Sequence, residues 1–265
     1  MRGFVVSRGP KRNWRTWTTI IVSLVLVLGA AWYFLENPKN QTFGNTITGV
    51  FVHQKVVALT FDDGPNPPYT DQIVDYLHAA HVPATFFVVG RAVEQYPDVV
   101  RKEVRYGNAL GNHSWDHAHM VLERSQHIAR EIEQTDDVIY RITGIHTRLF
   151  RPPFGARDYA VINTARRMGY QVIMWSVPLP RDWERPPPTV IRDRVLRYVK
   201  DGDIIVLHDG NRGKGGNREN TVEATKLIVE ALRARGYRFV TVPQLLHVGY
   251  LERRTAGNPS PTAPE

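Results

Sequence analysis

Short apolar runs alternate with amphipathic helical patterns along most of this 265-residue chain, and this alternation constrains the fold more than any other feature. The apolar runs predict strands at residues 55–61, 84–90, 108–114, 148–155, 171–177, 203–209 and 238–242. Parallel neighbours need a long crossover connection, usually a helix, so a strand–helix alternation predicts parallel pairing. We therefore expect one α/β domain, a distorted and incomplete (β/α) barrel of about seven parallel strands, with an open doubly wound sheet as the alternative.

The N-terminal segment differs from the rest of the chain. Residues 1–17 contain basic residues and no acidic ones, and residues 18–35 form an uncharged apolar run with aromatic borders. About 18 residues is near the lower limit for a membrane-spanning helix, and preceding basic residues favour a cytoplasmic N-terminus. We expect a single-pass membrane anchor with the remainder of the chain outside the cytoplasm. The alternative is a cleaved signal peptide, with the small residues Gly29 and Ala31 near the cleavage site, which would make the protein secreted.

Composition excludes several classes of protein. The formal net charge is +8, but five of the positive charges lie within residues 1–17, so the rest of the chain lacks the basic surface that nucleic-acid binding requires. The absence of cysteine excludes a disulfide framework and a thiolate metal site, so any metal must be held by imidazole and carboxylate. Residues 36–54 resemble a linker, residues 55–250 form the folded domain, and residues 251–265 are Pro-, Ser- and Thr-rich and predict a disordered tail.

Unusual polar residues fall at the ends of the expected strands. They are Asp62 and Asp63 after the first strand, His113 after the third, Arg151 after the fourth, Trp175 in the fifth, and His208 with Asp209 after the sixth. In a parallel barrel the carboxyl ends of all strands open onto one face, which is where barrel enzymes place their active sites. The sequence therefore predicts that these side chains meet.

Two pairs of residues, one of histidines and one of aspartates, indicate a metal site. His113 and His117 are four residues apart, so one helical turn would place both imidazoles on the same side, in an arrangement that suits zinc when a third ligand arrives from elsewhere. Adjacent carboxylates at a buried strand end repel unless a cation or an arginine neutralises them. A metal on one of Asp62 and Asp63, and an arginine on the other, would resolve this repulsion.

The motifs TFDDGP, HSWDH, RPPFG, WSV…RDW and VLHD occur in the order and spacing of the polysaccharide deacetylase family, which the sequence resembles from about residue 55 to 243. This resemblance implies that Asp63, His113 and His117 hold a divalent metal ion. Zinc is the expected ion, with cobalt and other divalent ions as alternatives, since a site of two histidines and one carboxylate accepts all of them.

The resemblance also assigns catalytic roles. Asp62 would be the general base, held in place by Arg151, and His208 would be the general acid that protonates the departing amine. The backbone N–H of Phe154 would help to bind the oxyanion. Trp183 and Leu207 would line the pocket for the acetyl methyl group.

The fifth motif departs from the family pattern. Pro178 stands where the family usually has an aspartate, and the segment Arg181–Asp182–Trp183 is displaced by one residue. The resemblance implies that Asp182 reaches His208 and tunes its pKa, although the aspartate usual in the family is replaced by Pro178.

The expected activity is metal-dependent removal of N-acetyl groups from an envelope or extracellular polysaccharide, with peptidoglycan ahead of chitin-like oligomers. The alternatives are an O-deacetylase of another glycan, a carbohydrate-binding pseudoenzyme of the same fold, and an amidohydrolase that acts on small cyclic amides. Partners other than the polysaccharide and the membrane are not indicated, and neither nucleic acid nor an obligate protein partner is expected.

Overall fold

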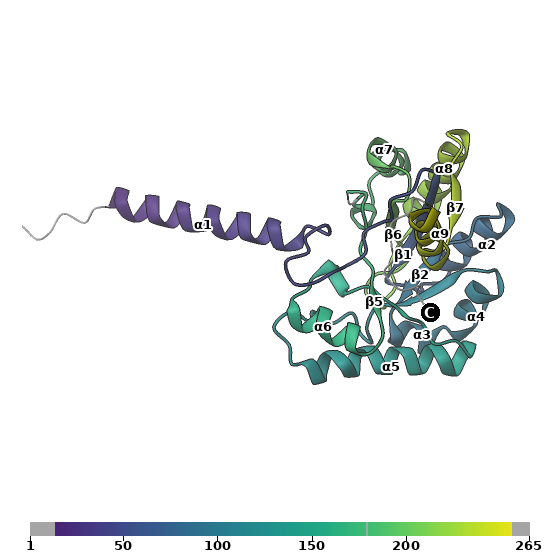
Figure 1. Cartoon of the computed structure of the whole chain (residues 1–265), viewed down its shortest axis with the longest axis horizontal. Helices are drawn as coiled ribbons and strands as arrows, with labels where there is room; N and C mark the ends of the chain where they lie inside the picture. The colour runs from purple at the N-terminus through teal and green to yellow at the C-terminus, as the bar shows by residue number, and fades with distance from the viewer. Residues whose placement is uncertain (1–13, 179, 256–265) are drawn as a thin grey trace, which may run out of the picture.

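A computed structural model describes residues 14–178 and 180–255 of the chain (Figure 1). Its strands are β1 (Val56–Asp62), β2 (Thr85–Val88), β3 (Ala109–Asn112), β4 (Leu149–Phe150), β5 (Gln171–Val172), β6 (Ile204–His208) and β7 (Arg238–Val240). The helices are α1 (Trp14–Glu36), α2 (Tyr69–Ala79), α3 (Gly90–Gln95), α4 (Pro97–Arg105), α5 (Ser125–Thr143), α6 (Tyr159–Arg167), α7 (Pro188–Tyr198), α8 (Glu219–Ala234) and α9 (Val242–Thr255). Two short 3₁₀ helices, η1 (Pro153–Gly155) and η2 (Asp182–Glu184), follow β4 and β5.

The seven strands form one parallel sheet in the order β5-β4-β3-β2-β1-β6, with β7 paired to β1. The C-terminal half of β1 pairs with β2 and its N-terminal half pairs with β7, while β6 runs along β1 from Ala58 to Asp62. This curled, incomplete parallel barrel confirms the expected α/β architecture.

Helices cover the outer face of the curled sheet. Alternate residues of β1, such as Leu59 and Phe61, pack into a core with α2, α7 and α8, and α5 and α6 form a further apolar layer beside β4 and β5. The other residues of the strands, such as Ala58 and Val206, point to the inner face and pack against Leu245 of α9. Strands β1 to β5 follow one another in a single direction across the sheet, so right-handed crossovers place their connecting helices on one face, and the reversal of strand order that defines a doubly wound sheet is absent from β1 to β5.

The strands that were expected at residues 148–155 and 171–177 are shorter than the apolar runs. Pro152 and Pro153 cannot donate hydrogen bonds to a neighbouring strand, so β4 ends at Phe150 and pairs with β5 over two residues only. The sheet is therefore weakly paired at this end.

The gap between β5 and β6 is filled by a segment that precedes the barrel. Ile47 forms a parallel bridge with Ile173, and Gly49 forms an antiparallel bridge with Asp203. Upstream, the buried side chain of Arg157 donates from Nη2 to the carbonyl oxygens of Asn37, Pro38 and Asn40 at 2.8–3.2 Å. Residues 37–50, which we call the strap, are thus hydrogen-bonded to both edges of the sheet, although residues 36–54 resembled a linker in the sequence.

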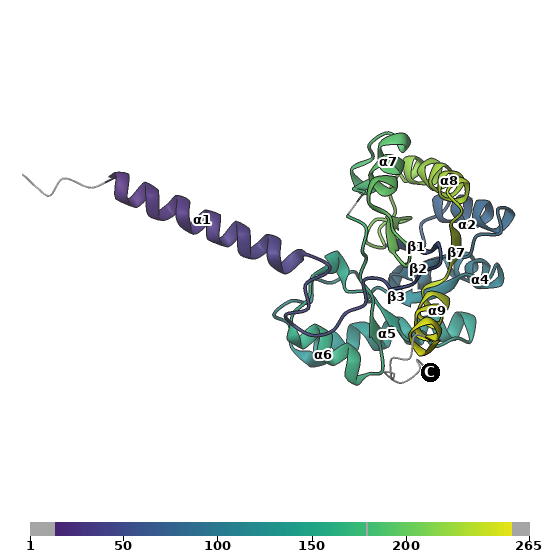
Figure 2. The ribbon, with the colours of Figure 1, turned by 45° about the horizontal axis from the view of Figure 1, so that its top comes forward.

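The ends of the chain lie partly outside the described residues. Within residues 14–255 as described, α1 extends away from the barrel (Figure 1, Figure 2), and its apolar side chains from Trp14 to Leu28 are exposed. No helix in this described part is both long enough and apolar enough to cross a membrane, which leaves the expected anchor at residues 18–35 without support. Most of the expected basic segment (residues 1–13) and of the tail (residues 256–265) lies outside the described residues, and α9 continues to Thr255.

Candidate active site

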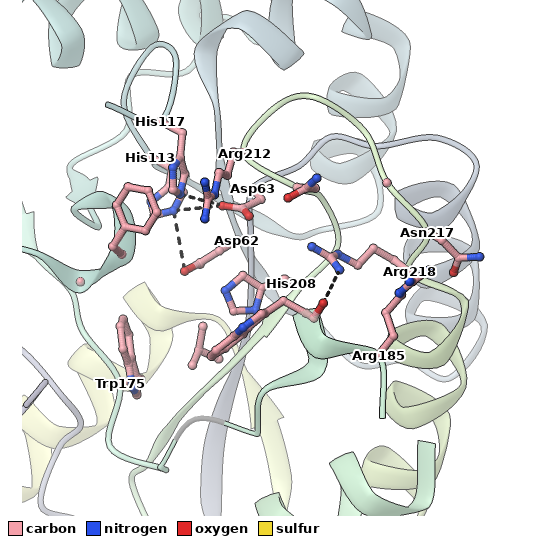
Figure 3. A pocket seen from close by; sticks show the side chains of 16 residues that line it. Asp62, Asp63, His113, His117, Trp175, Arg185, His208, Arg212, Asn217 and Arg218 are labelled. Carbon is pink, nitrogen blue, oxygen red and sulfur yellow. Dashed lines mark hydrogen bonds and ion pairs between the residues drawn. The ribbon is translucent and has the colours of Figure 1, made fainter. Parts of the chain in front are cut away.

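The polar residues at the strand ends meet in one cavity of about 490 Å³, as the sequence predicted (Figure 3). The register of the sheet explains this convergence, because Asp62 at the end of β1 is directly paired with His208 at the end of β6. Asp62, Asp63, His113, His117 and His208 all line the cavity.

Asp63, His113 and His117, which we call the metal triad, bring three ligand atoms within 4.8 Å of one another. Asp63 Oδ1 lies 3.4 Å from Nε2 of His113 and 3.1 Å from Nε2 of His117. All three side chains are buried. Burial acts to raise the pKa of Asp63, but the contacts with His113 and His117 together with the charge of His208 outweigh it and hold that pKa well below its usual range.

The triad fits a divalent ion such as zinc. Nδ1 of His113 lies 2.7 Å from the carbonyl oxygen of Arg151, which fixes the ring and directs Nε2 toward Asp63. A hydrogen bond of this kind to the far ring nitrogen is usual for a histidine that binds a metal. Asp63 Oδ1 is buried and makes no hydrogen bond apart from its ion-pair contacts with the two histidines. A cation at the triad would satisfy this oxygen.

The loop that carries His113 and His117 is not a helical turn, so the spacing argument reached the right pair for the wrong reason. Ser114 (φ 64°) and His117 (φ 62°) both adopt left-handed backbone conformations, which are rare outside glycine. They reverse the chain so that both imidazoles face Asp63. The carboxylate of Glu131 in α5 accepts hydrogen bonds from the N–H groups of Trp115 (3.0 Å) and Asp116 (3.3 Å) and holds this loop in place.

Asp62 is paired with Arg151, as expected from the two adjacent carboxylates. Nη1 of Arg151 donates to Asp62 Oδ1 at 2.6 Å and to the hydroxyl of Thr60 at 2.8 Å. Nε and Nη2 donate to the carbonyl oxygens of Ile173 and Met174. The guanidinium is fully buried and lies 4.0 Å from the centre of the Phe87 ring. Burial lowers the pKa of Arg151, although the charge of Asp62 opposes this effect.

Asp182 reaches His208 despite the displaced motif. Its Oδ1 lies 2.9 Å from Nδ1 of His208, and its Oδ2 accepts hydrogen bonds from the backbone N–H of His208 (2.7 Å) and from the hydroxyl of Thr221 (3.0 Å). Burial alone would lower the pKa of His208, but the charge and hydrogen bond of Asp182 outweigh it and raise the pKa to about 9. This shift favours the protonated imidazole, the form that a proton donor needs.

The pocket residues expected from the resemblance are only partly found at the cavity. Phe154 and Trp183 line it, and Phe154 has a left-handed backbone (φ 60°). Leu207 is wrongly placed by the sequence argument: it is fully buried in the outer core, and Val206 lines the cavity instead. Side chains alternate along a strand, so the residue two positions before His208 shares its face.

Several cavity residues were not predicted individually from the sequence, although the loop that carries most of them was a candidate for binding an anionic or sugar-rich chain. Arg185, Arg212, Arg218, Asn211 and Asn217 line it together with the others. Four of these five belong to the loop after β6, whose Gly-, Arg- and Asn-rich composition was the only signal available. The loop is attached to the end of β1, because the N–H of Gly213 donates to the carbonyl of Asp63 at 3.2 Å and Asn66 Nδ2 donates to the carbonyl of Gly216 at 2.8 Å.

Comparison with known proteins identifies relatives over the same part of the chain. The family model described as polysaccharide deacetylase matches residues 50–173. The chain is 38% identical over 195 residues to a peptidoglycan-N-acetylglucosamine deacetylase of Bacillus cereus, covering 73% of this chain and 89% of that protein. It is 37% identical to a chitooligosaccharide deacetylase of Rhizobium leguminosarum, covering 71% and 90%. It is 39% identical to the peptidoglycan-N-acetylmuramic acid deacetylase PdaC of Bacillus subtilis, covering 80% of this chain but 41% of that longer protein.

Solved structures show the same fold. A crystal structure of a peptidoglycan N-acetylglucosamine deacetylase superposes with a TM-score of 0.71 at 28% identity, covering 76% of this chain and 92% of the other. A CE4-family pseudoenzyme from Bacillus anthracis superposes with a TM-score of 0.70 at 29% identity, covering 76% and 68%.

Proposed function

This chain belongs to the polysaccharide deacetylase family, and we propose that it hydrolyses N-acetyl groups of N-acetylhexosamine residues in peptidoglycan or a chitin-like glycan with the help of a divalent ion. One observation carries the proposal: the metal triad, Asp62 and His208 line one cavity, and the buried residues Arg151 and Asp182 hold Asp62 and His208 in place from behind. A sugar-binding protein has no need for a proton acceptor, a proton donor and a cation site in one place.

The metal triad would hold the ion, which when bound supplies Lewis acidity to water and to the acetamide carbonyl. Asp62 is the proton acceptor for the attacking water. Its Oδ1 is held by Arg151, and Oδ2 lies on the triad side, 3.9 Å from Nε2 of His113. Arg151 therefore fixes the direction in which Asp62 presents its free oxygen to the water.

His208 lies across the cavity and donates a proton to the departing amine nitrogen. Its Nδ1 is engaged by Asp182, so Nε2 is the ring nitrogen that serves the substrate. Within the η1 turn, the N–H of Gly155 donates to the carbonyl of Pro152 and the N–H of Ala156 donates to the carbonyl of Pro153, so the turn does not require the N–H of Phe154. That N–H is the backbone donor for the developing oxyanion, where loss of one donor typically costs about 10²–10³ in rate.

The test is acetate release by the full chain after metal removal and addition of zinc or cobalt. Chitooligosaccharides, peptidoglycan glycan strands and acetylated xylan serve as substrates. We expect zinc-dependent release from at least one N-acetylated substrate and loss of activity in Asp62→Asn. The matched control is Asp116→Asn, which changes an exposed carboxylate of the histidine loop that pairs with Arg91. Release that survives Asp62→Asn, or that is independent of metal, would refute the mechanism.

The same experiment distinguishes the other candidate functions. A pseudoenzyme of the same fold is known among the structural relatives, and for this chain it would bind glycan strands without releasing acetate. Release from acetylated xylan alone would favour O-deacetylation. An extracytoplasmic location for the enzyme is a further proposal, which rests on the substrate class and is tested by cell fractionation.

A further inference from the structure

Arg185 and Arg212 are exposed, line the cavity, and form no ion pair with any carboxylate among the described residues. The third cavity arginine, Arg218, differs from them. It is buried and donates to the carbonyl oxygens of Gly210 (2.6 Å) and Trp183 (3.4 Å), so it has a structural role.

Arg185 and Arg212 are held at the cavity by the backbone. Both adopt left-handed conformations (φ 57° and 53°), which cost about 1–3 kcal/mol for a non-glycine residue and persist only where the surroundings enforce them. The carbonyl oxygen of Arg185 accepts a hydrogen bond from Asn220 Nδ2 at 3.0 Å. The guanidinium of Arg212 lies 4.9 Å from the centre of the Phe154 ring, and that ring packs against His117 with their planes 79° apart.

The two arginines lie on opposite sides of the reaction centre. Arg212 is beside the metal triad, and Arg185 is beyond His208, next to Arg218 (Figure 3). The carboxylates at the centre already have partners: Asp62 pairs with Arg151, Asp63 contacts the two histidines of the metal triad, and Asp182 pairs with His208. The positive charge of the cavity rim is therefore left for the substrate.

A neutral N-acetylglucosamine polymer offers only hydroxyl and amide groups to these arginines. The planar guanidinium matches a carboxylate, to which it donates two parallel hydrogen bonds. Resting on the function proposed above, we propose that Arg212 and Arg185 recognise a carboxylate of the glycan, carried on or next to the reacting N-acetylhexosamine as in a 3-O-lactyl ether. The preferred substrate is then an acidic strand and not neutral chitin.

The test compares three substrates by their kcat/KM for acetate release. These are chitooligosaccharides, peptidoglycan strands stripped of peptide so that their lactyl carboxylates are free, and the same strands with those carboxylates converted to methylamides. We expect the ratio of kcat/KM for free-acid over methylamide strands to be roughly 10–100 in the wild type, the size of one or two hydrogen bonds to a charged group. The ratio falls toward one in Arg212→Gln and Arg185→Gln, and also falls at high salt.

Lys214→Gln is the matched control, because Lys214 is an exposed cation of the same loop that does not line the cavity. It should leave the ratio unchanged. A wild-type ratio near one overturns the proposal, and so does a high ratio that survives both arginine substitutions or falls equally in Lys214→Gln. If no substrate releases acetate, the proposed function fails. In that case calorimetric titration measures the affinity of the chain for the free-acid and for the methylamide strands. Tighter binding of the free-acid strands supports carboxylate recognition, and equal affinities overturn it.

Discussion

Replacement of Arg151 by methionine tests whether the buried pair with Asp62 organises the site. The change removes the partner of a buried carboxylate, and breaking such a pair typically costs about 3–5 kcal/mol. It also leaves the carbonyl oxygens of Ile173 and Met174 without their Arg151 donors, at up to about 1–3 kcal/mol for each group left unsatisfied. Because these contributions are not additive, we expect a loss of about 4 kcal/mol in the free energy of unfolding.

The assay is urea unfolding at pH 7 followed by circular dichroism, with excess chelator so that metal binding adds no stability. The control is a double-mutant cycle with Asp62→Asn. Removing both charges leaves no unpaired ion, so the double variant should be more stable than the sum of the two single losses predicts, by about 2 kcal/mol or more. Additive losses, or a loss below about 1 kcal/mol in Arg151→Met, would refute the reasoning.

Further changes test the metal site, the acid and a buried carboxyl group. Zinc at about 100 times its Kd should stabilise the chain by about 2.7 kcal/mol, and His117→Ala should abolish the zinc-dependent rise in Tm. Glu131→Gln loosens the loop between the two histidines and should weaken zinc binding about 10–100-fold in a competition assay with a chelating dye. Asp182→Asn removes the charge that raises the pKa of His208, so the effect of burial prevails and the alkaline limb of the kcat/KM profile should move to lower pH. Bound metal lowers the pKa of His208 in the wild type and in the variant alike, so the two metal-loaded proteins are compared with each other. The side-chain oxygens of Glu103 are buried without hydrogen-bond partners, and burial raises its pKa well above 4.5, so the native state is disfavoured increasingly as pH rises above that value. Glu103→Gln should therefore raise Tm by an amount that grows from pH 4 to 7, whereas an equal gain at all pH values would contradict this.

The order of strands and helices along the chain could be predicted because each long apolar run lies within a short stretch of sequence. The apolar runs of β1 and β6 are long enough to be recognised, and the helices between strands indicate parallel pairing. The short strands β4 and β5 gave weaker signals because they pair with each other over two residues only, and Ile173 beyond β5 bridges to the strap. The strap was missed because its bridges to Ile173 and Asp203 join residues far apart in sequence.

The site was predictable where one motif supplies the side chains, and less so where tertiary contacts do. The spacing of His113 and His117 paired the two histidines and the family resemblance added Asp63, but neither indicated the left-handed turn that brings them together. Glu131 carried no signal, since its role is a hydrogen-bonding contact from a distant helix. The placement of Leu207 is an error that the two-residue period of a strand could have prevented.

The backbone around Asp182 explains how this residue reaches His208 although its motif is displaced by one residue. Arg181 and Arg185 both have left-handed backbones and bracket η2, which points Asp182 toward His208. The one-residue displacement of the motif is thereby absorbed before the side chain reaches its partner.

The strap has a consequence for where the domain can be cut. A fragment that starts at the first residue of β1 would lose the bridges to Ile173 and Asp203, which lie next to β5 and β6, and would leave the guanidinium of Arg157 without three of its four acceptors. We therefore expect a fragment that begins at or before Asn37 to be more stable to urea than one that begins at Val56, because only the longer fragment keeps these contacts. Arg157 also donates from Nη1 to the carbonyl of Gly155, in the η1 turn that presents the Phe154 N–H, so loss of the strap contacts to Arg157 should also disturb this turn.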